Sequence, residues 1–150
     1  MTGINIKPLV SLALITAFLL SACATTVYIS EDLSPAELIQ RAQEASDRNR
    51  YNVAKQYYEA LYQRNQTNLD LIITAEYEIA FIYYKQKKYD IAREKFAGVL
   101  EYYNTPDEEL LPLHFKRLSQ IVLQSIDEKE KSLTKASGKK AGDGEQESEQ

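Results

Sequence analysis

Residues 75–103 read AEYEIAFIYYKQKKYDIAREKFAGVLEYY, and this stretch decides the fold. Apolar and aromatic side chains recur in it at three- and four-residue spacing on both sides of the polar turn at residues 86–88. Such spacing is typical of two amphipathic helices joined by a short turn. No stretch rich in Val, Ile and Thr alternates with the period of two that is typical of strands. The pattern therefore predicts an all-α protein.

The same pattern occurs 38 residues earlier in the chain. Tyr51-Asn52-Val53-Ala54 aligns with Tyr89-Asp90-Ile91-Ala92, and a polar turn precedes the tyrosine in each copy. The other matching residues are Ala42 with Ala80, Tyr58 with Phe96, and Leu61 with Val99. The small alanines let two antiparallel helices approach closely within each copy. An internal repeat of roughly 20–50 residues is the signature of a solenoid, so we expect a short α-solenoid.

The spacing predicts helices near residues 35–48, 51–64, 69–86 and 89–103, and a fifth helix that runs to about Lys131. Ser34-Pro35-Ala36-Glu37 has the residues of a capping box with proline at the first helical position. Residues 105–108 repeat this arrangement later in the chain. Both tetrapeptides therefore predict a helix start.

The fifth helix carries an apolar stripe, which comprises Leu111, Phe115, Leu118, Val122 and Ile126. Pro112 either kinks this helix or marks its start after a short turn. A further shift of 38 residues places Leu118 opposite Ala80. We therefore interpret the fifth helix as the first helix of a third repeat, which caps the second repeat as solenoids require.

The second copy resembles the tetratricopeptide repeat (TPR). Ala80, Tyr83, Tyr89, Ala92, Phe96 and Val99 carry the resemblance. Asn49 and Lys87 occupy the places where that family has a turn glycine. The family's usual repeat is about 34 residues, so the loop around residues 65–69 is expected to be longer here. The resemblance implies a scaffold whose first helices line a concave groove.

The amino terminus predicts export and lipid attachment. Lys7 precedes an apolar run, and Leu20-Ser21-Ala22-Cys23 resembles the lipobox of bacterial lipoproteins. The resemblance implies that residues 1–22 are a signal peptide and that Cys23, the single cysteine, carries acyl chains such as palmitate. The alternatives are an uncleaved anchor, or a secreted protein whose cysteine is incidental. Residues 23–33 are then expected to be a flexible tether.

Composition indicates the extent of the folded domain and one class of partner that it excludes. Residues 34–131 form the expected helical domain, whereas residues 132–150 contain only one large apolar side chain and are expected to be disordered. The net charge of −4 argues against nucleic acid as a partner, because phosphate binding needs a clustered basic surface.

No residues point to catalysis, a metal or another cofactor. His114 is the single histidine and is expected on the surface, so no second ligand completes a zinc site. Carboxylates at Glu76 and Glu78, or at residues 107–109, are interpreted as a solvated face and a helix start. We therefore expect a protein that is not an enzyme.

One aromatic stripe is the candidate binding site. Tyr77, Phe81, Tyr84 and Lys85 fall on one face of the third helix, and Phe115 occupies the corresponding place on the last helix. The resemblance places these residues in the TPR groove, where they would bind a protein segment. The alternative is that these rings only pack against the long loop and the fifth helix.

The lipobox and the repeats together resemble envelope lipoproteins of the BamD type, the TPR subunits of outer-membrane β-barrel assembly. We therefore expect a lipid-anchored adaptor on the periplasmic face of the outer membrane, and Ala24 after the cysteine favours that membrane. One alternative is a ligand- or substrate-capture lipoprotein that serves a transporter. Another is a pilotin-like helper of a secretion or pilus pore.

Overall fold

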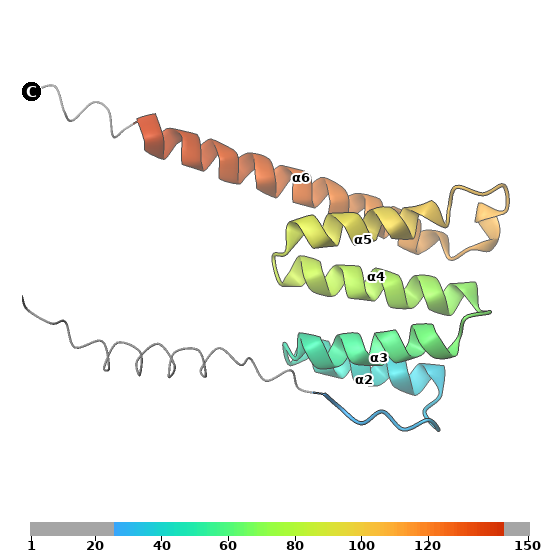
Figure 1. Cartoon of the computed structure of the whole chain (residues 1–150). Helices are drawn as coiled ribbons and strands as arrows, with labels where there is room; N and C mark the ends of the chain where they lie inside the picture. Colours follow the sequence, from blue (N-terminus) through green and yellow to red (C-terminus); the bar gives the residue numbers. More distant parts are fainter. Residues whose placement is uncertain (1–25, 143–150) are drawn as a thin grey trace, which may run out of the picture.

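The structure is a computed structural model, which describes residues 26–142 and their side chains as far as Lys135. The signal peptide, Cys23 and residues 143–150 lie outside the described residues. The described chain is all-helical and comprises α2 (Pro35–Asp47), α3 (Tyr51–Arg64), α4 (Leu69–Lys85), α5 (Tyr89–Glu101), the short 3-10 helix η1 (Glu108–Leu110) and α6 (Leu113–Gly142). Adjacent helices pack as successive antiparallel pairs, with α6 against α5 and α4 (Figure 1). This arrangement is a short solenoid-like all-α fold and confirms the predicted fold class.

The four repeat helices begin and end within two residues of the predicted positions. However, the expected long loop after α3 is absent, because only residues 65–68 separate α3 from α4. The extra residues instead lengthen α4, which has 17 residues where α2 has 13. One added helical turn thus accounts for the 38-residue spacing, since a turn takes about 3.6 residues.

The capping box at Ser34 forms as predicted. The Ser34 hydroxyl accepts a hydrogen bond from the Glu37 amide at 3.4 Å, and the Glu37 carboxylate accepts one from the Ser34 amide at 2.9 Å. The Ser34 hydroxyl also donates to the Glu37 carboxylate at 2.7 Å, and this bond, together with that from the Ser34 amide, lowers the pKa of Glu37. The second predicted helix start, at residues 105–108, is wrong, because the chain there turns into η1. The long helix α6 begins after Pro112, which settles the two alternatives for that proline in favour of a start.

Asn49 and Lys87, 38 residues apart, give the two inter-helix turns the same backbone geometry. Both have positive φ, of 57° and 60°, although neither is glycine. In each turn this residue's amide donates to the carbonyl three residues before it, and the next amide donates to the carbonyl five residues before. This pairing satisfies carbonyls that the end of a helix leaves free. The repeat is therefore visible in the turns as well as in the helices.

The repeat also appears in the core. The equivalent pairs Ala42 and Ala80, Ala54 and Ala92, Tyr58 and Phe96, and Leu61 and Val99 are all at most 1% exposed. Alanine at the helix crossings permits close approach, and one large aromatic ring fills the space beside each crossing. The two copies thus build two similar clusters side by side.

The helical phase of α6 differs from the prediction at one position. Leu118 is 39% exposed, whereas Ser119 is fully buried between Phe115 and Val122 on the packing stripe. A small residue at this point lets α6 approach the second repeat, as Ala80 does elsewhere. The alignment of Leu118 with Ala80 is therefore wrong by one residue, and Leu118 faces outward.

The segment 26–33 is packed against the domain, in contrast to the expected flexible tether. Arg64 donates hydrogen bonds to the carbonyls of Ile29 and Ser30 at 3.2 and 3.0 Å. The Val27 amide donates to Gln56 Oε1 at 3.1 Å. Val27, Ile29 and Leu33 also pack against the first cluster. We call residues 26–33 the strap.

The carboxyl-terminal prediction also needs correction. Residues 132–142 continue α6 as a helix, so the expectation of disorder from residue 132 is wrong for this part. Extending an existing helix costs much less than nucleating one, and alanine and lysine are good helix formers. Figure 1 shows α6 continuing past the α4–α5 turn. No helix in the described residues is long and apolar enough to span a membrane.

The strained turn at Lys87 generates a stability prediction. Lys87→Gly should raise the free energy of unfolding by about 0.5–1 kcal/mol, because glycine adopts positive φ without the steric cost of a side chain. Asn49→Gly is the matched control and should raise the free energy of unfolding by less. Asparagine tolerates positive φ, and Asn49 Oδ1 accepts a 2.7 Å hydrogen bond from Tyr51 that the variant would lose. Urea unfolding measures both changes. Destabilisation by Lys87→Gly would contradict the assigned turn.

Candidate partner-binding groove

An open hollow of about 400 Å³ lies on the side of the solenoid where α2, α4 and α6 face one another. The helix α4 forms its floor, α2 forms one wall and α6 forms the other. The lining side chains are Gln43, Ser46 and Asp47 from α2, Tyr77, Glu78, Phe81 and Lys85 from α4, Phe115 and Leu118 from α6, and Tyr58 from α3. We call this hollow the groove.

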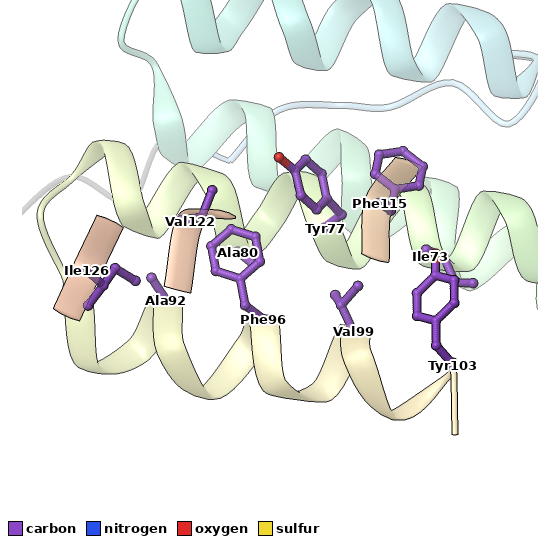
Figure 2. Close-up of a cluster of buried hydrophobic side chains, with 10 residues drawn as sticks. All are labelled: Ile73, Tyr77, Ala80, Ala92, Phe96, Val99, Tyr103, Phe115, Val122 and Ile126. Carbon is purple, nitrogen blue, oxygen red and sulfur yellow. The ribbon is translucent and has the colours of Figure 1, made fainter. Parts of the chain in front are cut away.

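The aromatic side chains of α4 form a ladder beneath and beside the groove. The Tyr77 ring centroid lies 4.8 Å from that of Phe115 on α6 and 5.5 Å from that of Phe96 on α5. The ladder continues to Phe81 at 6.1 Å, and from Phe81 to Tyr84 at 5.8 Å. Figure 2 shows Tyr77, Phe96 and Phe115 within the buried cluster that α4, α5 and α6 share. Tyr77 therefore joins three helices.

The predicted site residues divide into buried and accessible groups. Tyr77 and Phe115 are only 6% and 9% exposed, so they belong to the core as well as to the groove. Burial raises the pKa of the Tyr77 hydroxyl to about 12. Phe81 is half-buried and Lys85 is exposed, and both line the groove. Tyr84 stacks on Phe81 but does not line the hollow.

Lys85 ties the floor of the groove to its polar wall. Its ammonium donates a hydrogen bond to the Ser46 hydroxyl on α2. The same ammonium lies 5.6 Å from the ring centroids of both Tyr51 and Phe81. Attraction between a cation and an aromatic face strengthens such contacts. Lys85 thus marks the end of the groove near the two inter-helix turns.

Glu78 is a partly buried carboxylate in the groove floor that the sequence interpretation placed on a solvated face. Burial raises its pKa, and attraction to the Lys85 ammonium only partly offsets that rise. Burial and the nearby Glu78 charge in turn raise the pKa of Tyr58. The expected partner carboxylate, Glu76, instead lines hollows on the other side of α4. Side chains two residues apart on a helix point in nearly opposite directions.

Sequence reasoning missed Glu78 and Leu118 as groove residues. Glu78 lies three residues before Phe81 and seven before Lys85, a spacing that would have placed it on the same helical face. Leu118 was assigned to the core because the true phase of α6 depends on the small Ser119. His114 is exposed, as expected, and the described side chains include no group of three or more potential metal ligands.

A second hollow, of about 370 Å³, lies on the opposite side of α4 between α3 and α5. Three glutamates from three helices line it, namely Glu59, Glu76 and Glu94, together with Tyr83 and Lys95. The space above Gly98 is open. This acidic hollow provides a surface of different chemistry against which the groove can be compared.

Comparisons with known proteins give one informative similarity. The chain is 34% identical over 117 residues to an uncharacterized protein of Treponema pallidum (strain Nichols). The match covers 76% of this chain and 47% of that protein, so the chain spans about half the length of this relative. No family model matches the chain. No solved structure matches it.

The raised pKa of Glu78 predicts a pH-dependent stability. A carboxyl whose pKa is higher in the folded protein binds more protons there, so stability falls as the pH rises through its titration. Glu78→Gln should therefore stabilise the protein at pH 7, and the gain should vanish below about pH 4, where the carboxyl is protonated in both states. Urea unfolding at the two pH values measures this.

The matched control for Glu78→Gln is Glu94→Gln on the exposed face of α5, which should change little at either pH. An equal gain for Glu78→Gln at both pH values would show that burial of the charge is not its cause. Destabilisation at pH 7 would show that the charged form is favoured.

Proposed function

We propose that this protein is a non-enzymatic adaptor, anchored in the cell envelope by acyl chains on Cys23, which binds a protein partner in its groove. The observation that carries the proposal is the groove itself, with an aromatic floor and two walls of different polarity. The TPR-like repeat and the lipobox support the class of function and its location on the periplasmic face of the outer membrane. A role in outer-membrane protein assembly remains part of this proposal.

The open form of the groove favours a protein segment over a small molecule. Ligand sites enclose most of a small ligand, whereas an open channel between helices suits an extended peptide or a helix. Phe81 presents accessible apolar surface from the floor of the groove, and Leu118 presents it from the α6 wall. Aromatic and apolar anchors of this kind carry most of the binding energy at protein interfaces.

Charge in the groove defines the complementary partner. Asp47, Glu78 and Lys85 place two carboxylates and one ammonium around the apolar floor. A partner segment that fits these groups presents an apolar anchor to Phe81 and Leu118, with a basic side chain toward the α2 wall. Charge complementarity of this kind fixes the register of a bound segment.

Leu118→Arg tests the groove, and Ile121→Arg on the same helix is its control. Both leucine and isoleucine are exposed, at 39% and 59%, but only Leu118 lines the groove. After crosslinking in cells that naturally produce the protein, Leu118→Arg should lower recovery of the co-purified partner at least fivefold. Ile121→Arg should not. Equal recovery with both folded variants would exclude the groove as the binding surface.

Cys23→Ser tests the anchor separately. Without the acylated cysteine, the protein should remain unprocessed and leave the membrane fraction. Fractionation and mass spectrometry of the intact chain provide the measurement. Retention of Cys23→Ser in the membrane as a lipidated species would overturn the anchor, whatever the outcome at the groove.

A further inference from the structure

The Tyr58 hydroxyl is a buried polar group that lacks a hydrogen-bond partner. Tyr58 is 1% exposed, and it is the α3 residue that lines the groove. Its hydroxyl oxygen is shielded from solvent and accepts or donates no hydrogen bond within the described residues. A buried hydroxyl without a partner costs free energy of folding, and such groups are uncommon in native proteins. The fold therefore bears a cost at this position that an aromatic ring alone would avoid.

The second repeat shows that core packing does not require this hydroxyl. Phe96 occupies the equivalent position 38 residues later and is fully buried in the cluster that Figure 2 shows. A phenylalanine ring thus fills the same place in the same architecture. The role of the Tyr58 hydroxyl consequently lies in the groove and not in the packing of the first cluster.

Two carboxylates from different helices act on the Tyr58 hydroxyl. Burial raises the pKa of Tyr58, and the charges of Glu78 on α4 and of Asp47 on α2 raise it further. All three residues line the groove. Neither carboxylate forms an ion pair within the described residues. The unpaired hydroxyl therefore lies near two negative charges that have no direct cationic partner.

The positive charge already present in the groove does not pair with these carboxylates. The Lys85 ammonium attracts Glu78, but it donates its hydrogen bond to Ser46 and forms no ion pair within the described part of the chain. The α6 side chains of the groove, Phe115 and Leu118, are uncharged. Attraction between opposite charges is stronger where water is partly excluded, as it is at Glu78. This part of the groove therefore favours an external cation.

We propose that Glu78, Tyr58 and Asp47 form a pocket that takes a lysine or arginine side chain of the partner segment. This inference rests on the proposed function and assigns the basic side chain of the partner to one place in the groove. The cation donates hydrogen bonds to the carboxylates, and the Tyr58 oxygen accepts another, so the hydroxyl gains the partner that it lacks in the free protein. Side-chain rotations, which are common when interfaces form, admit the cation to the shielded hydroxyl. The apolar stem of the basic side chain packs on Phe81.

Selection from random peptides displayed on phage tests the pocket. Peptides selected on the purified full-length protein should carry a lysine or arginine near a large apolar residue, and Leu118→Arg should abolish their binding. Replacement of the basic residue by neutral acetyl-lysine or citrulline should weaken binding at least about fivefold, because charge-assisted hydrogen bonds are the stronger ones. With the Glu78→Gln protein, this replacement should have little effect. Glu94→Gln, beside the acidic hollow, is the control and should preserve the full loss.

Tyr58→Phe tests the hydroxyl separately. It should raise the urea midpoint of the free protein, because an unpaired buried hydroxyl is removed, and yet weaken the selected peptide at least about threefold. A role in packing alone would not weaken the peptide. Tyr62→Phe removes a hydroxyl from the same helix beside the acidic hollow and should leave the peptide affinity unchanged. Unchanged affinity for Tyr58→Phe, or a lower urea midpoint, would overturn the role of the hydroxyl.

The outcomes separate this inference from the proposed function. If no selected peptide loses binding with Leu118→Arg, the groove does not bind a protein segment, and the proposed function and the pocket are both overturned. If the peptides depend on Leu118 but lack a basic residue, the pocket alone is overturned. The pocket is also overturned if neutral replacement weakens binding equally with the Glu78→Gln protein and with the unaltered protein.

Discussion

The rest of this structure depends on the aromatic contacts of the Tyr77 ring. A solenoid of two repeats leaves the face of its last repeat uncovered, and α6 covers it. Tyr77 contacts Phe96 and Phe115 at once, so it joins the second repeat to that covering helix. Aromatic pairs contribute about 0.5–1.5 kcal/mol each beyond their buried area. Because α6 is held here, its exposed Leu118 becomes one wall of the groove.

Much of the fold could be predicted because the two copies carry the same packing residues. Periodicity located four helices to within two residues. The TPR resemblance pointed to Asn49 and Lys87 as turn positions, and both have positive φ. The errors arose where a local pattern was outweighed by packing. An added turn of α4, rather than a longer loop, accounts for the 38-residue spacing, and the small Ser119 sets the helical phase of α6. The strap could not be predicted, because its order comes from contacts with α3 that are distant in sequence.

The candidate site was predicted less completely, for a related reason. Helical spacing grouped Tyr77, Phe81 and Lys85 correctly on one face of α4. It could not say which of these side chains the neighbouring helices would bury. Burial made Tyr77 a core residue and left Phe81 half-exposed. Burial also raises the pKa of Glu78, a residue that the sequence pattern placed on a solvated face.

The central claim is that the groove, and not another face, binds a protein. Site-specific photocrosslinking tests it most directly, with the photoreactive residue at position 118 in the groove or at position 63 beside the acidic hollow. In cells that naturally produce the protein, position 118 should yield a discrete adduct with one partner, and position 63 should yield none. Adducts from position 63 alone, or the same adducts from both positions, would contradict the account.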